Sequence, residues 1–184
     1  GGYDVYLNLS HDRGATWKRT DVKLNDDPAM PAALDHKLAV DGDRVYASWM
    51  TRSTVDQKFK IVVRSSEDKG EHWLPPVVAY SSSNQPGKPD LVPTPAGLVL
   101  CWQDVGAARC SRSADHNKSW STDVLIDGSD GTEGVFLAAD PKGRAHLLVA
   151  KKPSNDERKR LNLFHTVSVD GGPFSNLQRL NGGE

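Results

Sequence analysis

The segment Ser66-Glu67-Asp68-Lys69-Gly70-Glu71-His72-Trp73 decides the fold, because its pattern S-x-D-x-G-x-x-W recurs along the chain. The first copy occupies residues 10–17, and the third, at residues 113–120, carries asparagine in place of glycine. The fourth begins at residue 168, closes one residue early and ends in phenylalanine. Four fixed positions match by chance in about one of 10⁵ windows, so four copies at intervals of 56, 47 and 55 residues indicate a repeat.

Each copy is predicted to form a tight β-turn. An aspartate at the start of a turn accepts backbone N–H groups, and the residue two positions later often needs a positive φ. Glycine fits that position best, and asparagine tolerates it better than other residues with side chains. The closing aromatic can bury on the order of 200 Å² between sheets. The turn residues are Ser10, Asp12, Gly14, Trp17, Ser66, Asp68, Gly70, Trp73, Ser113, Asp115, Asn117, Trp120, Ser168, Asp170, Gly172 and Phe174.

Short segments typical of β-strands flank every copy. They precede the first, second and fourth copies, and others follow all four. Hairpin patterns also lie upstream of the last three copies. Each unit therefore has four antiparallel strands in about 50 residues, the size of one propeller blade. The predicted segments are 5–9, 22–24, 38–40, 45–49, 61–63, 77–78, 91–92, 98–102, 124–126, 135–138, 145–149, 161–167 and 177–180, with one more strand before the third copy.

The sequence thus predicts an all-β fold, a β-propeller segment of fourteen strands or about three and a half blades. The half blade spans residues 3–24, and the complete blades span about 36–80, 88–127 and 133–181. Propellers close at roughly 4 to 8 blades, and an open ring would expose strand edges. We therefore expect a fragment of a longer propeller, or a ring completed by a second copy.

The four copies resemble the Asp-box, or BNR, repeats of sialidase-like β-propeller proteins, and the resemblance covers nearly the whole chain. It implies that the repeated turns are structural and lie on the face opposite the ligand site. The ligand face would carry the loops at residues 25–37, 51–60, 79–90, 103–107, 127–134 and 151–162.

Sialidases of this fold bind the substrate carboxylate through three arginines and use a tyrosine nucleophile paired with a glutamate, with an aspartate as acid/base. Guanidinium groups match carboxylates bidentately. Arg52, Arg158 and Arg160 fall on the implied loops as candidate ligand-binding residues. The catalytic candidates are Tyr80, Asp130 and Glu133, but their spacing does not define a catalytic set, and the family's F-R-I-P motif is absent. A solvated charged loop is the alternative for Arg158 and Arg160.

The two cysteines are predicted to face each other. If Val105 and Gly106 form a two-residue hairpin loop, Cys101 lies opposite Cys110 in a non-hydrogen-bonded pair. A disulfide there would contribute about 2 kcal/mol and imply an oxidising compartment; two buried thiols are the alternative. Together with the resemblance, this pair favours a periplasmic or secreted location.

Composition excludes several functions. Lys plus Arg number 23 and Asp plus Glu 24, so no basic surface is available to recruit nucleic acid, and no stretch of about 18 apolar residues forms a membrane span. The six histidines have no metal-ligand spacing, and no cofactor motif is present. A calcium site from Asp123, Asp127, Asp130 and Glu133 is disfavoured against a solvated acidic turn.

Three hypotheses for function follow. The first is a propeller that binds glycans or a protein through loops on one face. The alternative is a glycoside hydrolase of the exo-sialidase type, with part of its active site outside this segment. The third is a scaffold or assembly factor without catalysis.

Overall fold

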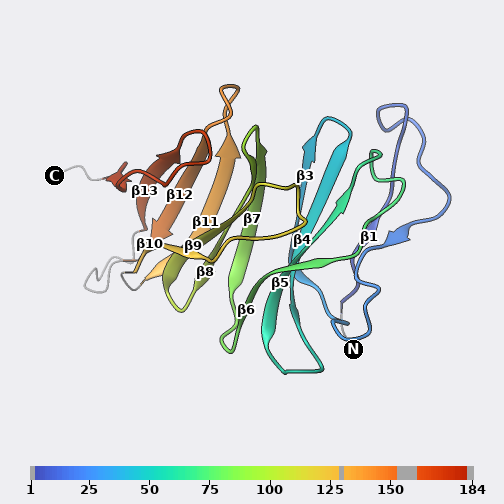
Figure 1. Ribbon diagram of the computed structural model, residues 1–184, viewed down its shortest axis with the longest axis horizontal. Coiled ribbons are helices and arrows are strands. Elements are labelled where there is room, and N and C mark those ends of the chain that lie inside the picture. The colour runs from blue at the N-terminus through green and yellow to red at the C-terminus, as the bar shows by residue number, and fades with distance from the viewer. Residues whose placement is uncertain (1–2, 129–130, 153–160, 182–184) are drawn as a thin grey trace. The chain divides into compact units, whose positions relative to one another are not determined.

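The computed structural model describes residues 3–128, 131–152 and 161–181, which form three four-stranded antiparallel sheets and one two-stranded sheet (Figure 1). The fourteen strands occur in the predicted order, and no helix is present among the described residues. The described residues therefore contain no helix that could cross a membrane. The chain divides into two compact units, Gly1–Ser83 and Asn84–Glu184.

Unit 1 contains the two-stranded sheet and one complete blade. The strands β1 (Tyr6–Leu7) and β2 (Val22–Lys23) pair with each other. The blade has the order β3 (Leu34–Asp41), β4 (Arg44–Arg52), β5 (Phe59–Ser66) and β6 (Val77–Ser82).

Alternating residues of this blade form the core of unit 1. Ala47, Trp49 and Val62 lie at most 3% exposed and pack against Leu24 and Met30 from the segment before the blade. Successive side chains of a strand point to opposite faces, so these residues share the face that packs against the preceding segment, although β4 and β5 are buried along most of their length on both faces.

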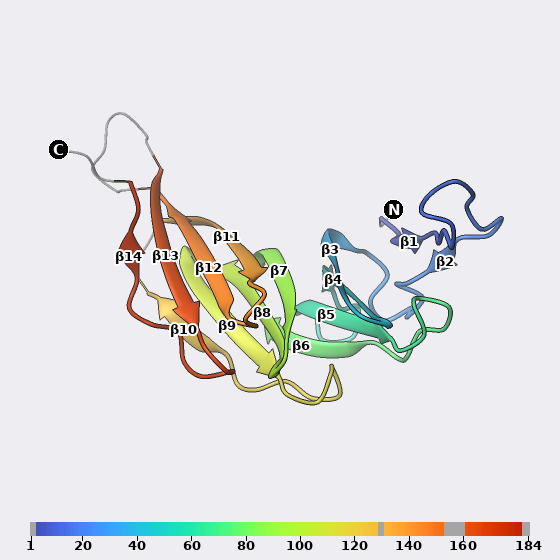
Figure 2. The ribbon, with the colours of Figure 1, turned by 90° about the horizontal axis from the view of Figure 1, so that it is seen from above.

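Unit 2 contains two complete blades, which Figure 2 shows as successive sheets. The first consists of β7 (Gly87–Thr94), β8 (Gly97–Asp104), β9 (Ala107–Ser113) and β10 (Val124–Asp127). The second consists of β11 (Thr132–Ala139), β12 (Ala145–Lys151), β13 (Asn162–Ser168) and β14 (Gln178–Arg179). Val99, Cys101 and Ala108 of the first blade form one core with Leu147 and Val149 of the second.

The β8–β9 hairpin has the predicted register. Asp104 pairs with Ala107, and Cys101 pairs with Cys110. The two loop residues, Val105 and Gly106, both have positive φ, 48° and 77°, as a type I′ turn requires. The cysteines form a disulfide inside the core, where they are 0% and 3% exposed.

The first three repeated segments fold into the same hydrogen-bonded turn. In the second copy, the Ser66 hydroxyl donates to Asp68 and accepts from the Gly70 backbone N–H, at 2.8 Å each. Asp68 also accepts the His72 N–H at 2.9 Å, and this bond is the main cause that lowers the pKa of Asp68 to about 2. The equivalent bonds occur in the other two copies, through Ser10, Asp12, Gly14 and Thr16 and through Ser113, Asp115, Asn117 and Ser119.

Positive φ falls on two consecutive residues of these turns. Gly14, Gly70 and Asn117 have φ values of 90°, 92° and 78°, and the residue before each is also left-handed. Asn117 additionally accepts a hydrogen bond from the Trp120 indole at 2.8 Å. Its amide side chain therefore stabilises a turn in which its backbone occupies the position of glycine.

The fourth turn differs from the expectation. Positive φ falls on Asp170 and Gly171 rather than on Gly172, because this turn is one residue shorter and closes through the Ser168–Phe174 bridge. The Ser168 hydroxyl donates to the Gly172 carbonyl at 2.6 Å. Asp170 thus occupies a left-handed turn position instead of the one that Asp68 holds in its own turn.

The closing aromatics also differ from one another. Trp73 is half-buried against the core of unit 1, whereas Trp17 is 62% exposed, contrary to the predicted burial between sheets. Trp73 packs against the same core cluster as Leu7 and Val22 of the sheet that precedes its own. The described residues include no sheet before that of Trp17, so its indole lacks an equivalent surface. That all residues belong to one propeller segment stays a prediction.

Candidate functional site

Two predicted ligand-side loops of unit 1, at residues 25–37 and 51–60, contact each other. The Thr54 backbone N–H donates to the Ala29 carbonyl at 2.9 Å, and the Ser53 N–H closes the second loop on the Lys58 carbonyl at 2.9 Å. Asp56 lies in the same loop, where a hydrogen bond with Ser53 is the main cause that lowers its pKa. These bonds place both loops at the same end of the blade.

Arg52 is the last residue of β4 and presents an exposed side chain at this end. Its Nε donates to the Gln57 carbonyl at 3.2 Å, and its Cζ lies 5.4 Å from the centroid of the Phe59 ring. Phe59 is its direct partner on β5. The guanidinium is therefore held in place by a hydrogen bond and a cation–π contact while it remains open to solvent.

Tyr80 lies within the edge strand β6, not after it as predicted, because β6 continues to Ser82. It is half-buried and pairs with Ile61. The register places Tyr80 on the same face as Arg52, with β5 between them, two strand spacings across and two residues along the sheet, or about 12 Å between the two backbone positions.

Three predicted ligand-side loops of unit 2 are also joined. The Thr132 N–H donates to the Gly106 carbonyl at 2.9 Å, and the Lys152 N–H donates to the Gly131 carbonyl at 2.8 Å. Gly131 has a φ of 101°, and a Cβ there would lie 2.3 Å from the Lys152 carbonyl oxygen. Only glycine therefore allows this close approach.

The charged side chains at this end of unit 2 form ion pairs. Lys151 Nζ lies 2.5 Å from Asp127, and Arg109 Nη1 lies 2.6 Å from Asp123. Glu133 is the second residue of β11 and is exposed, and its carbonyl accepts from Lys88 Nζ at 2.6 Å. Asp127 and Asp123, two of the four residues considered for a calcium site, are therefore paired with basic side chains. No group of three or more metal-ligating residues occurs among the described residues.

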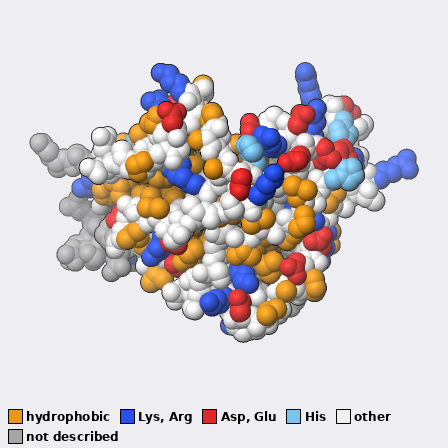
Figure 3. Space-filling model, viewed as in Figure 1, with side chains coloured by type: hydrophobic (Ala, Val, Ile, Leu, Met, Phe, Trp, Pro, Cys, Tyr) orange, Lys and Arg blue, Asp and Glu red, His pale blue; other side chains and the backbone are white. Residues whose placement is uncertain are grey.

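Three sequence candidates, Asp130, Arg158 and Arg160, lie outside the described residues. In the space-filling view of Figure 3, side chains of both charge signs mix over the drawn face. This mixture agrees with the balanced composition and offers no large basic surface on that face.

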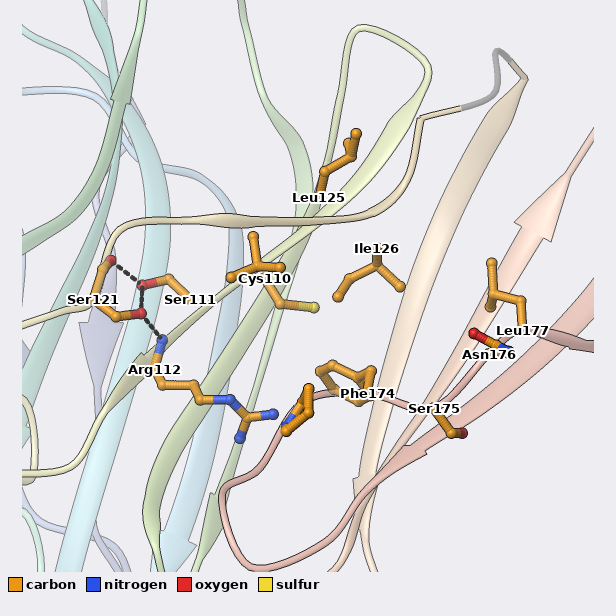
Figure 4. Close-up of a pocket in the computed structure, with 12 residues that line it drawn as sticks. Cys110, Ser111, Arg112, Ser121, Leu125, Ile126, Phe174, Ser175, Asn176 and Leu177 are labelled. Atoms are coloured by element: carbon orange, nitrogen blue, oxygen red, sulfur yellow. Dashed lines mark hydrogen bonds between the residues drawn. The ribbon is translucent and has the colours of Figure 1, made fainter.

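A pocket that sequence analysis did not predict lies in unit 2, with a volume of about 270 Å³ (Figure 4). Ile126 of β10 and Phe174 of the fourth turn give it apolar walls, and Ser111 and Ser121 also line it. The hydroxyl groups of these two serines lie 3.3 Å apart. The walls come from segments about 50 residues apart, so no local pattern could have indicated the pocket.

Arg112 also lines this pocket, but its guanidinium is occupied by structural contacts. Nη2 donates to the Ser168 hydroxyl at 2.7 Å and to the Gly172 carbonyl at 2.8 Å, and Cζ lies 5.2 Å from the Phe174 ring centroid. Burial lowers the pKa of the Arg112 guanidinium. The residue therefore links β9 to the fourth turn, and the pocket is mainly apolar with hydroxyl groups.

No protein-family model and no curated protein matches this chain. Several solved structures are similar to it. A Penicillium chrysogenum alpha-L-arabinanase complexed with arabinobiose matches with a TM-score of 0.69 at 15% identity, over 97% of this chain and 59% of that one. A Dyadobacter fermentans protein of unknown function matches with a TM-score of 0.61 at 16% identity, over 97% and 53% of the respective chains.

The NanB sialidase of Streptococcus pneumoniae matches with a TM-score of 0.60 at 16% identity, over 94% of this chain and 28% of that one. This chain thus spans less than two thirds of the length of each of these proteins. At such identities the likeness concerns the fold alone. The fold is of the β-propeller type found in these glycoside hydrolases, and the described residues supply three four-stranded blades and one two-stranded sheet of that type.

Proposed function

We propose that this chain is part of a glycan-binding β-propeller of the Asp-box class and binds its ligand through the loop end of its blades. The observation that carries the proposal is the position of Arg52, which is exposed, fixed over Phe59 and placed beside two joined loops. A planar guanidinium can bind a sugar carboxylate or a pair of hydroxyls with two parallel hydrogen bonds.

The course of β5 supports a division between a ligand end and a structural end. The loop at residues 51–60 leads into this strand, and the repeated turn at residues 66–73 leaves it. An eight-residue strand separates the two by about 26 Å. The hydrogen bonds shared by the first three turns, which fasten neighbouring strands, support assignment of these segments to the Asp-box class.

A second candidate is a glycoside hydrolase of the exo-sialidase type. It is favoured because two of the similar structures are named as an arabinanase and a sialidase. Tyr80 shares a sheet face with Arg52, as a nucleophile beside a substrate-binding arginine would. In this interpretation the remaining catalytic groups come from outside the described residues.

The disulfide supports a periplasmic or secreted location for the protein. Such bonds persist in oxidising compartments and are rare in the reducing cytosol. The sulfurs of Cys101 and Cys110 are buried in the core of unit 2, so the bond is structural rather than exposed to exchange.

Calorimetric titration with 3′-sialyllactose and with arabinotriose tests the proposal. We expect one of these probes to bind, and Arg52→Ala to weaken that binding about 10- to 100-fold, because a hydrogen bond to a charged group contributes about 1.5 to 3 kcal/mol. Arg52→Lys should weaken it less, since the charge remains but the planar fork is lost.

The matched control is Arg19→Ala, which removes another exposed arginine of unit 1, close to the first repeated turn. Its affinity should equal that of the wild type. Equal affinities of wild type and Arg52→Ala would contradict the proposed site. Release of a fluorophore from a fluorogenic sialoside, lost in Tyr80→Phe, would favour the hydrolase instead.

A further inference from the structure

Two histidines that are distant in sequence meet on the last blade. His146 of β12 and His165 of β13 are both partly buried, and their rings meet edge to edge with centroids 5.2 Å apart and planes inclined by 16°. His146 Nδ1 lies 3.0 Å from His165 Nε2. Ala145, Leu147 and Val149 point into the core from the same strand, so strand alternation places His146 on the opposite face.

We propose that this pair is a two-histidine binding site for a divalent transition-metal ion such as Zn²⁺, Ni²⁺ or Cu²⁺. Metal–nitrogen bonds of 2.0 to 2.1 Å separate two ligand nitrogens by about 2.9 Å at a right angle and by about 3.4 Å at a tetrahedral angle. The 3.0 Å separation falls within that range. With the centroids 5.2 Å apart, the two nitrogens point almost straight at each other, so each ring has to turn by about 45° for both lone pairs to reach one ion.

The surrounding groups set the ring state that metal binding needs. His146 Nε2 lies 3.3 Å from Asp140 Oδ2, to which it donates, so the lone pair of His146 is on Nδ1, toward His165. Asp140 is held in turn by Arg144, whose Nε and Nη2 each lie 2.6 Å from the same oxygen. A carboxylate on the far nitrogen is the usual outer partner of a metal-binding histidine.

Without metal, one proton between His146 and His165 satisfies both nitrogens. Metal binding moves that proton from Nε2 to Nδ1 of His165, so the ring stays neutral and both coordinating nitrogens carry lone pairs. The remaining coordination positions are filled by water or by an oxygen of a ligand. Nineteen residues separate the two histidines, and β12–β13 pairing brings them together, which sequence spacing did not indicate.

Calorimetric titration of the metal-free chain with Zn²⁺ at pH 7.5 tests the site. We expect one ion to bind per chain, and His146→Ala or His165→Ala to weaken binding at least tenfold. Asp140→Asn, which keeps an acceptor oxygen for the turn, should weaken it about 10- to 100-fold. The control is His72→Ala, which removes an exposed histidine that also pairs with a carboxylate, 2.6 Å from Asp68. That variant should bind Zn²⁺ like the wild type.

A second measurement needs no variant. Nitrogen-15 NMR of the histidine rings in the native chain should show Zn²⁺-dependent shifts at Nδ1 of His146 and Nε2 of His165. Unshifted rings at saturating Zn²⁺, or equal affinity in wild type and His146→Ala, would overturn the proposal.

Discussion

Opening the disulfide between Cys101 and Cys110 should lower the free energy of unfolding by about 2.5 kcal/mol. The bond joins residues with a sequence separation of 9 in the β8–β9 hairpin. The entropy removed from the unfolded chain by closing a loop of about nine residues is about 8.7 cal/mol/K, or about 2.6 kcal/mol at 25 °C. Reduction leaves both side chains in the core, so it isolates this contribution of the cross-link.

Urea unfolding with and without a phosphine reductant measures the difference. Tryptophan fluorescence is a suitable signal, because Trp102 is fully buried beside Cys101 on the same strand. The control is the double variant Cys101→Ala/Cys110→Ala, whose unfolding should not respond to the reductant. A difference below about 0.5 kcal/mol between the oxidised and reduced wild type would refute the reasoning, since it would mean that the cross-link does not restrict the unfolded chain.

Three further predictions concern the turns. Gly97→Ala should lower the free energy of unfolding by about 3 kcal/mol, because φ is 112° and a Cβ would lie 2.2 Å from the Ser113 carbonyl oxygen. Gly42→Ala should lower it by only about 1 kcal/mol, because φ is 59° and no atom lies within 4 Å of the added Cβ. Urea unfolding of the two variants measures the difference. Asn117→Ala should be less stable than Asn117→Gly by about 1 kcal/mol in the same assay, because alanine is strained at a φ of 78°. The pKa of Asp68 is about 2 in the folded chain and about 3.9 when unfolded, so the ionised carboxylate stabilises the folded chain. This stabilisation is present above about pH 4 and is lost as the pH falls toward 2. Urea midpoints of Asp68→Asn should therefore change less than those of the wild type over that interval.

The fold was predictable because the repeat carried local information. The Asp68 turn has a side-chain pattern that specifies its own hydrogen bonds, and Gly106 fixed the β8–β9 register and the Cys101–Cys110 pair. Strand order then followed from the spacing of the copies. Among the four turns, only the fourth, which is one residue shorter than the others, departed from the predicted backbone pattern: Gly171 rather than Gly172 has a positive φ.

The candidate site was less predictable, because its contacts join segments that are distant in sequence. The sequence placed Arg52 on a loop but could not show that Phe59 lies beneath its guanidinium. Trp17 likewise has the same motif position as Trp73, yet its exposure depends on a neighbouring sheet rather than on local sequence. The pocket beside Phe174 and the pair of His146 and His165 depend on the same kind of long-range packing.

We propose that ligands bind at the loop end of the blades, opposite the repeated turns. Hydrogen–deuterium exchange of the chain with and without 3′-sialyllactose or arabinotriose tests it most directly. We expect the bound probe to slow exchange in residues 25–37 and 51–60 and to leave exchange in residues 10–17 and 66–73 unchanged. Protection confined to the repeated turns, or no protection by either probe at saturating concentration, would contradict it.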